Sequence, residues 1–183
     1  MTRPNRVPDQ VVAPYLEVII GAVWWVIGTL ALPSGIGTVL MAAGLGVTGV
    51  LWTTARRRFG AGVRLDPERR TRLLRLVLGA LGLIVLAVVG LGATSWAELR
   101  APVACAIVAA VLFPLASLLQ ERSYVAVGGL LLVLGASGAL LALDAAGSAG
   151  PQGLVGMGAA AALWGAGALR FGLLEDVRDR VRR

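Results

Sequence analysis

Six apolar stretches separated by short polar segments constrain the fold of this chain more than any other feature. A transmembrane helix needs about 20 mostly apolar residues to cross the hydrocarbon core of a bilayer. The stretches lie at about residues 15–32, 36–54, 73–93, 102–119, 124–143 and 154–171, and none has a charged residue near its centre. Hydrophobic residues make up 57% of the 183 positions, too large a share for a soluble core to hide. We therefore predict an all-α polytopic bundle of six transmembrane helices.

Arginine supplies every one of the seventeen basic residues, and its distribution predicts the orientation of the bundle. Arginine near the ends of transmembrane helices is retained on the cytoplasmic side. In a bundle with an even number of helices, both termini and every second loop lie on the same side of the membrane. All of the arginines except Arg100 fall in these segments. We expect residues 1–14 to be a cytoplasmic N-terminal segment, 15–171 the membrane domain and 172–183 a basic amphipathic cytoplasmic tail. The first stretch has no small-residue cleavage pattern, so no cleaved signal peptide is expected.

Capping residues predict where several helices begin. Pro14 suits a first helical position, and Ser34 suits the cap of the second helix. Asp66, Pro67 and Glu68 combine a cap, a first-turn proline and an acidic residue at the positive end of a helix. The third helix is therefore expected to begin before its membrane part.

Two prolines affect the fourth helix. The capping-box spacing of Ser95 and Glu98 predicts a short interfacial turn that carries Trp96, and Pro102 then restarts or bends the helix. Pro114 lies inside the fourth stretch, where it frees a backbone carbonyl and favours a kink. Such a kink either shapes the helix or marks a transport site.

The net charge of +7 indicates anionic lipid headgroups, rather than nucleic acid, as the partner of this chain. The arginines flank apolar stretches and are not interleaved with aromatic residues on a separate basic face. Candidates for contact with anionic lipid or a protein partner are Arg56, Arg57, Arg58, Arg69, Arg70, Arg180, Arg182 and Arg183. The alternative is that these side chains are solvated and only fix the topology.

Residue types that carry chemistry are scarce, and we predict a protein that is not an enzyme. The chain has no lysine for a Schiff base and no histidine for haem or metal binding. Cys105 has no second thiol and is expected to be a packing residue. Glu17 and Asp144 lie near span ends, where interfacial solvation is expected. We predict no catalytic residues, cofactor or metal site.

The hydroxyl residues inside the stretches are expected to bond to the backbone of their own helices. They are Thr29, Thr38, Thr48, Ser117 and Ser137.

Trp24, Trp25 and Trp164 lie near the middle of the first and last stretches, away from the interfaces that tryptophan prefers. A buried indole N–H needs a hydrogen-bond acceptor. These side chains either fill space opposite small residues or form an aromatic wall around an apolar or amphipathic ligand.

Small residues predict close packing between helices, because lipid competes equally for larger apolar side chains. They are Ala42, Gly46 and Gly49 on the second helix, Gly138 and Ala142 on the fifth, and Gly158, Ala161, Ala162 and Gly165 on the sixth. Their spacing does not separate contacts within one chain from contacts in a homo-oligomer. The chain is also interpretable as three hairpin pseudo-repeats, whose first helices carry Gly21, Gly79 and Gly128 at a similar depth.

The first hairpin resembles the HdeD-type acid-resistance membrane proteins. Gly21, Gly28, Pro33 and Gly44 follow the glycine, glycine and proline rhythm of that family, although the proline comes sooner after the second glycine. The second and third hairpins have Gly92 and Asp144 where a proline would continue the pattern. The resemblance implies a six-helix inner-membrane protein linked to stress or acid tolerance, without a catalytic site.

These observations favour a non-enzymatic, multipass integral protein of the bacterial cytoplasmic (inner) membrane. It would act by packing, by lipid interaction or as a subunit of an assembly with a membrane protein partner. The alternative is a small-solute transporter, or the substrate-binding membrane subunit of one.

Overall fold

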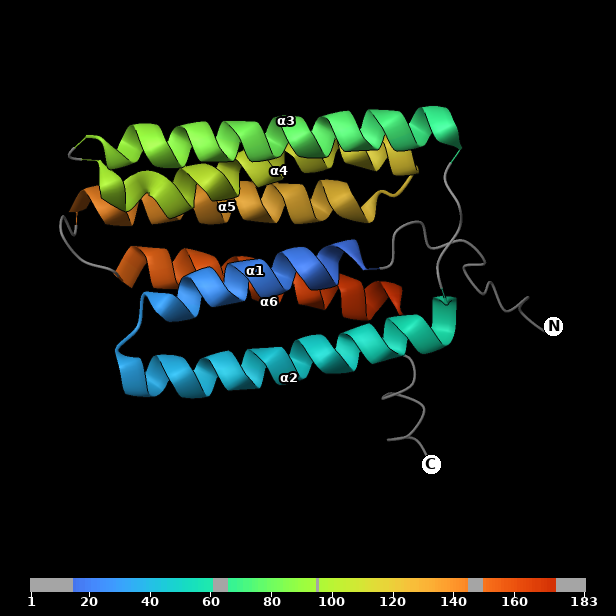
Figure 1. The fold of residues 1–183 in the computed structure, drawn as a ribbon, viewed down its shortest axis with the longest axis horizontal. Coiled ribbons are helices and arrows are strands. Elements are labelled where there is room, and N and C mark those ends of the chain that lie inside the picture. The colour runs from blue at the N-terminus through green and yellow to red at the C-terminus, as the bar shows by residue number, and fades with distance from the viewer. Residues whose placement is uncertain (1–14, 61–65, 95, 145–149, 174–183) are drawn as a thin grey trace.

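The computed structural model describes residues 15–60, 66–94, 96–144 and 150–173. These ranges are helical apart from short connections and contain no strand. The elements are α1 (Leu16–Leu30), α2 (Ser34–Phe59), α3 (Pro67–Gly92), the 3₁₀ turn η1 (Ala97–Leu99), α4 (Arg100–Leu119), α5 (Ser123–Asp144) and α6 (Gly150–Arg170). Successive helices run in opposite directions along one long axis (Figure 1). The prediction of six helices is confirmed.

Five of these helices are long and apolar enough to cross a membrane: α2, α3, α4 together with η1, α5 and α6. The remaining helix, α1, is apolar but has only 15 residues, fewer than the predicted span 15–32. At about 1.5 Å per residue it covers roughly 22 Å, less than the hydrocarbon thickness of about 30 Å. The structure is consistent with a multipass membrane protein in which five helices, rather than the predicted six, have spanning length.

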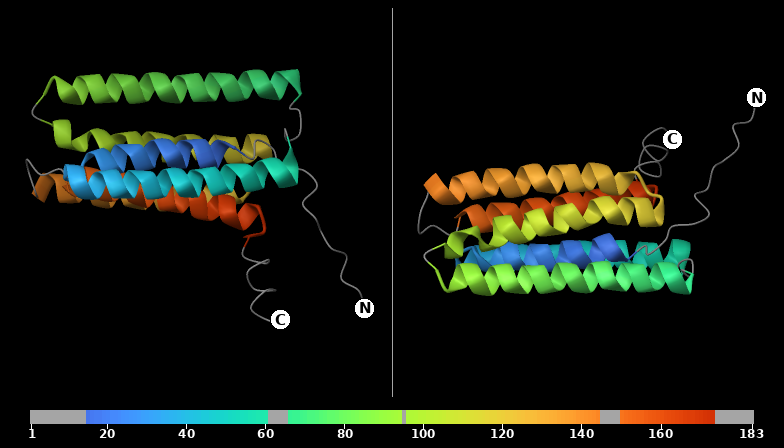
Figure 2. Two further views of the ribbon diagram at one scale, coloured as in Figure 1. Left: turned by 60° about the horizontal axis from the view of Figure 1, so that its bottom comes forward. Right: turned by 90° about the horizontal axis from the view of Figure 1, so that it is seen from above.

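The core of the bundle lies among α1, α4, α5 and α6. The most extensive helix contacts join α1 to α6 and α4 to α5. Val18, Leu131 and Leu163 are buried at these contacts. Helix α2 packs on α1 and the edge of α6, whereas α3 lies outside α4 and contacts only α4 and η1 among the described elements (Figure 2). Helix α3 has no buried residue, so most of its surface is left for lipid to cover.

The start of α3 is as the sequence predicts, whereas the cap of α2 lies one residue earlier than predicted. Asp66 and Pro67 are the cap and first residue of α3, as predicted, and the helix begins well before residue 73. Pro33, not Ser34, occupies the cap position of α2. The Pro33 backbone is extended and its carbonyl accepts the Gly37 N–H at 2.9 Å, so Ser34 is already helical. Pro14 lies outside the described residues.

The connection before α4 contains the predicted short turn. Trp96 precedes the 3₁₀ residues of η1 and is exposed. Pro102 lies in the first turn of α4, where its missing N–H costs no helical hydrogen bond, and Pro114 lies in the helix interior. Ser95 is outside the described residues.

The three glycines of the first-hairpin pattern each lie at a close contact between helices. A Cβ on Gly21 would come within 2.6 Å of the Trp164 ring, and one on Gly44 would overlap the indole of Trp25. A Cβ on Gly28 would come within 2.6 Å of the backbone nitrogen of Met157 on α6. Packing within one chain therefore accounts for all three positions.

The other glycines that were predicted to allow close packing divide into two groups. Gly138 faces Val155 and Gly158 faces Leu134, so these glycines let α5 and α6 approach each other. A Cβ added to Gly46 or Gly49 of α2, or to Gly165 of α6, would meet no described atom within 4 Å. Close packing within the chain is confirmed for the first group, whereas the second group faces outward.

The glycines that suggested three hairpin repeats have different surroundings. Gly21 lies under Trp164, a Cβ on Gly128 would approach the Ala109 carbonyl to 3.1 Å, and Gly79 has no described atom nearby. The pseudo-repeat therefore stays a prediction.

Candidate functional site

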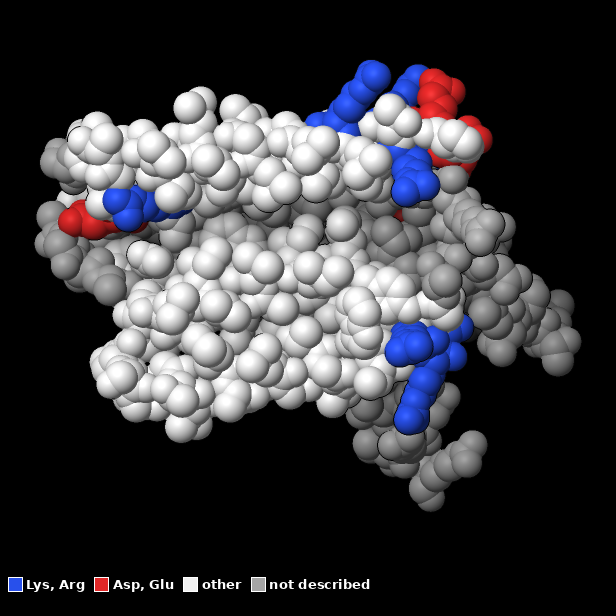
Figure 3. Space-filling model, in the orientation of Figure 1, with Lys and Arg blue, Asp and Glu red and all other residues white. Residues whose placement is uncertain are grey.

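Nearly all arginines of the described ranges lie at one end of the bundle, which we call the arginine-rich end. It consists of the starts of α1, α3 and α5 and the ends of α2, α4 and α6, and it is the right-hand end in Figure 3. Arg56–Arg58 close α2, Arg69–Arg75 begin α3, Arg122 lies between α4 and α5, and Arg170 ends α6. Arg100, at the start of α4, is at the opposite end.

A buried cluster of charged and polar side chains joins four segments at this end. The Arg170 guanidinium donates to the Glu17 carboxylate, to the Tyr124 hydroxyl at 2.8 Å and to the Glu121 carboxylate at 3.2 Å. Glu17 and Tyr124 are almost completely buried, and the Arg170 side chain is 7% exposed. We call Glu17, Glu121, Tyr124 and Arg170 the Arg170 cluster.

The burial of Glu17 corrects the expectation of interfacial solvation. Glu17 lies in the first turn of α1, on the face that packs against the last turn of α6, where Arg170 supplies the opposite charge. One carboxylate oxygen of Glu17 and the Nε of Arg170 have no hydrogen-bond partner among the described residues. Asp144, by contrast, is exposed at the end of α5, as expected.

The turn between α4 and α5 connects the Arg170 cluster to a neighbouring cavity. Gln120 ends α4 in the left-handed conformation at φ 55°, which is unusual for a residue other than glycine. This conformation reverses the chain so that Glu121 reaches Arg170 and accepts a hydrogen bond from Ser123 at 3.1 Å. The Gln120 side chain lines the cavity instead.

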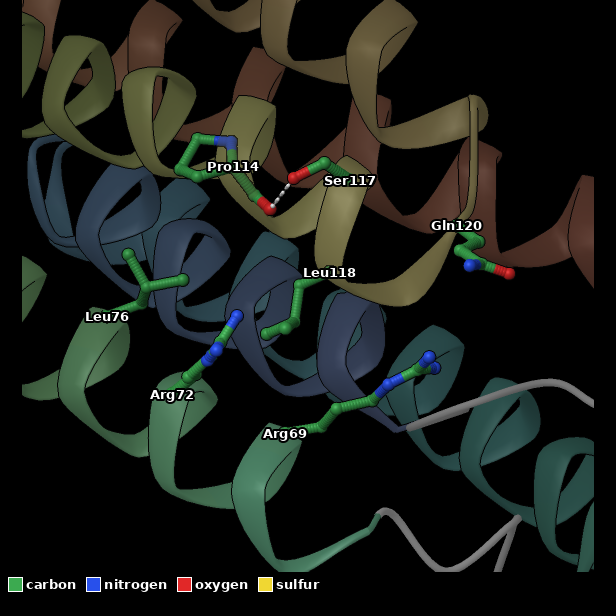
Figure 4. Close-up of a pocket in the computed structure, with 7 residues that line it drawn as sticks. All are labelled: Arg69, Arg72, Leu76, Pro114, Ser117, Leu118 and Gln120. Carbon is green, nitrogen blue, oxygen red and sulfur yellow. Dashed lines mark hydrogen bonds between the residues drawn. The ribbon is translucent and has the colours of Figure 1, made fainter.

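The cavity lies between α3 and α4 and has a volume of about 370 Å³. Its lining residues are Arg69, Arg72 and Leu76 from α3 and Pro114, Ser117, Leu118 and Gln120 from α4 and its C-terminal cap. Figure 4 shows the two arginine side chains extending from α3 toward α4. We call this space the α3–α4 cavity. The sequence predicts Arg69 as a lipid or partner contact, Pro114 as a kink that either shapes the helix or marks a transport site, and Ser117 as a hydroxyl bonded to its own helix. It does not predict Arg72, Leu76, Leu118 and Gln120 as site residues, because nothing in the sequence shows that α3 packs against α4.

The candidate tryptophans form a packed group away from this end. Trp24 and Trp164 are buried, and the rings of Trp25 and Trp164 pack with centroids 5.1 Å apart. The Trp25 indole donates to the Leu40 carbonyl at 2.8 Å, whereas the Trp164 N–H has no acceptor among the described residues. These tryptophans do not line the α3–α4 cavity. A ligand wall at these residues stays a prediction.

The candidate arginines lie in different environments. Arg56 and Arg57 are exposed at the end of α2, whereas Arg58 donates to the Phe171 carbonyl at 2.5 Å and so fastens α2 to the end of α6. Arg69 and Arg70 are exposed at the start of α3. Arg180, Arg182 and Arg183 lie outside the described residues.

The intramembrane hydroxyls behave as predicted. Thr29, Thr38, Thr48, Ser117 and Ser137 each donate to a carbonyl three or four residues earlier in the same helix.

Cys105 is buried in the core, as expected of a packing residue. Its sulfur lies 3.4 Å from the Leu131 carbonyl. Within the described ranges, no group of three side chains from histidine, cysteine, aspartate and glutamate gathers in a way that could hold a metal ion.

Comparisons with protein-family models, curated proteins and solved structures found no match. The resemblance of the first hairpin to HdeD-type proteins therefore stays a prediction.

Proposed function

We propose that this chain is a non-enzymatic multipass protein of the bacterial cytoplasmic (inner) membrane, which binds anionic lipids with its arginine-rich end on the cytoplasmic side. The observation that carries the proposal is the gathering of arginines at one end of an apolar bundle (Figure 3). Arginine near the membrane surface is attracted to anionic headgroups by about 1 kcal/mol per residue. The same asymmetry favours the cytoplasmic side for this end.

The orientation is tested by labelling single cysteines in intact cells. Cys105 is first replaced by alanine, and a cysteine is then introduced at Arg57 or, at the opposite end, at Thr94, both of which are exposed. A membrane-impermeant maleimide should label Thr94→Cys in intact cells, and Arg57→Cys only after the cells are permeabilised. Labelling in the reverse pattern would show that the proposed orientation is wrong.

Lipid preference is tested with the purified full-length protein. Its thermal unfolding is compared in nanodiscs of phosphatidylcholine alone and in nanodiscs that also contain phosphatidylglycerol. The anionic lipid should raise the unfolding temperature, and the effect should shrink at high salt, because salt screens attraction between exposed charges. Equal unfolding temperatures in both lipids would contradict the proposed interaction.

A further inference from the structure

We infer that the α3–α4 cavity binds the phosphate headgroup of one anionic phospholipid, whose acyl chains lie along the apolar surface of α3. The inference rests on the proposed function, because it requires the arginine-rich end to lie at the headgroup level of the membrane. It adds a defined site, with a named set of side chains, to a general attraction between arginines and an anionic surface.

The charges in the cavity suit a phosphate group. The Arg69 side chain is exposed and forms no hydrogen bond or ion pair with any other described residue. Arg72 pairs with Glu68 at 2.6 Å, but both side chains are more than half exposed, and such pairs one helical turn apart are weak. The planar guanidinium group matches phosphate oxygens with two parallel hydrogen bonds. Two such groups on one side of the cavity can therefore hold a phosphate between them.

Polar groups on the opposite wall complete the set of donors. Ser117 and Gln120 belong to α4 and its C-terminal cap, and they line the cavity across from the two arginines (Figure 4). The Ser117 hydroxyl donates to the Pro114 carbonyl at 2.8 Å, and a rotation about χ1 would direct it into the cavity. The Gln120 side chain is exposed there and carries two further N–H donors.

Apolar walls make a lipid, rather than a free phosphate ion, the occupant. Leu76 and Leu118 are half-buried and form the apolar part of the cavity wall. Beyond Leu76, α3 has no charged residue and exposes Leu78 and Leu81. Because α3 is covered by α4 and η1 alone among the described elements, acyl chains can follow its surface from the cavity.

The size of the cavity also fits a headgroup. Its volume of about 370 Å³ lies in the range of about 300–1,000 Å³ that is typical of small-molecule sites.

The site is tested with the full-length protein in a neutral detergent, titrated with phosphatidylglycerol that carries a fluorophore on one acyl chain. A micelle has no charged surface, so binding reports contacts with the individual lipid. Arg69→Gln/Arg72→Gln is compared with the matched control Arg56→Gln/Arg57→Gln, which removes the same charge from exposed positions at the end of α2. The first pair should weaken binding about tenfold or more. The control removes only the general attraction of two arginines outside the cavity, so it should weaken binding much less.

Two further variants distinguish loss of the site from loss of the fold. Glu68→Gln frees Arg72 from its partner and should tighten binding about twofold, which a damaged fold would not do. Leu118→Trp adds bulk to the cavity wall without changing charge and should weaken binding. In each variant, unreactive Cys105 shows that the bundle remains folded, because this lone cysteine is buried.

The remaining outcomes separate the inference from the proposed function. Equal weakening in both double variants would overturn the cavity site while leaving a general lipid preference intact. Displacement of the lipid by millimolar inorganic phosphate would also overturn it, because the occupant would then be a free anion. If the unmodified protein binds phosphatidylglycerol no better than phosphatidylcholine, both the proposed function and the site fail.

Discussion

Gly28 of α1 and Gly156 of α6 touch backbone to backbone, so that a Cβ built on Gly156 would lie 2.5 Å from the Cα of Gly28. The same two helices are joined at the arginine-rich end by the buried contact between Glu17 and Arg170. The first and last helices are thus held at two points of different chemistry. The contact between Gly28 and Gly156 is possible because neither residue has a side chain. The contact between Glu17 and Arg170 depends on opposite charges paired in apolar surroundings.

Gly156→Ala should destabilise the protein, because the new methyl group meets backbone atoms that cannot move aside. Overpacking of this kind costs about 1–3 kcal/mol. Gly165→Ala on the same helix is the control, since its Cβ would meet no described atom within 4 Å. Thermal unfolding in detergent, followed by the reaction of Cys105 with a thiol dye, measures the difference. If the two variants unfold at the same temperature, the α1–α6 contact is not as close as described.

Arg170→Gln should destabilise the protein more than Glu17→Gln does. Removing the arginine leaves the carboxylates of Glu17 and Glu121 without their cation, whereas removing Glu17 leaves Arg170 paired with Glu121. Breaking a buried ion pair typically costs about 3–5 kcal/mol. The double variant Glu17→Gln/Arg170→Gln should cost less than the sum of the single changes, because the two groups interact directly.

The matched control for this cluster is Arg72→Gln, which breaks an exposed ion pair with Glu68. Exposed pairs contribute at most about 1 kcal/mol, so the unfolding temperature should hardly change. A loss of stability in Arg72→Gln as large as in Arg170→Gln would show that burial does not set the strength of the Arg170 cluster.

Apolar length and capping residues predicted the helices of this chain, but not how they pack. The cap at Asp66, the turn at η1 and the backbone bonds of the hydroxyls are local features, which depend on residues a few positions apart. The pairing of Glu17 with Arg170 joins residues 153 positions apart and depends on α1 and α6 being neighbours. Spacing along one helix carries no information on its neighbours, so this cluster and the α3–α4 cavity became visible only in the structure.

Gly44→Ala should displace Trp25 from α2, because a Cβ at Gly44 would overlap the indole ring. The displaced ring would also lose its hydrogen bond to the Leu40 carbonyl. We expect a loss of about 1–3 kcal/mol, and little change in the control Gly46→Ala two residues further on. The cost of Trp25→Leu should be smaller in the Gly44→Ala background than alone. Strict additivity of the two changes would contradict a direct contact between these residues.

Arg58→Gln should destabilise the protein, whereas Arg57→Gln, which makes the same charge change one residue earlier, should not. Arg58 donates to the Phe171 carbonyl at 2.5 Å, where α6 has just ended and its last carbonyl groups lack helical partners. The rings of Phe59 and Phe171 pack beside this bond with centroids 5.7 Å apart. A hydrogen bond from a charged donor contributes about 1.5–3 kcal/mol, with the lower end expected at this exposed position. Equal unfolding temperatures for the two variants would indicate that the hydrogen bond from Arg58 to Phe171 adds no measurable stability.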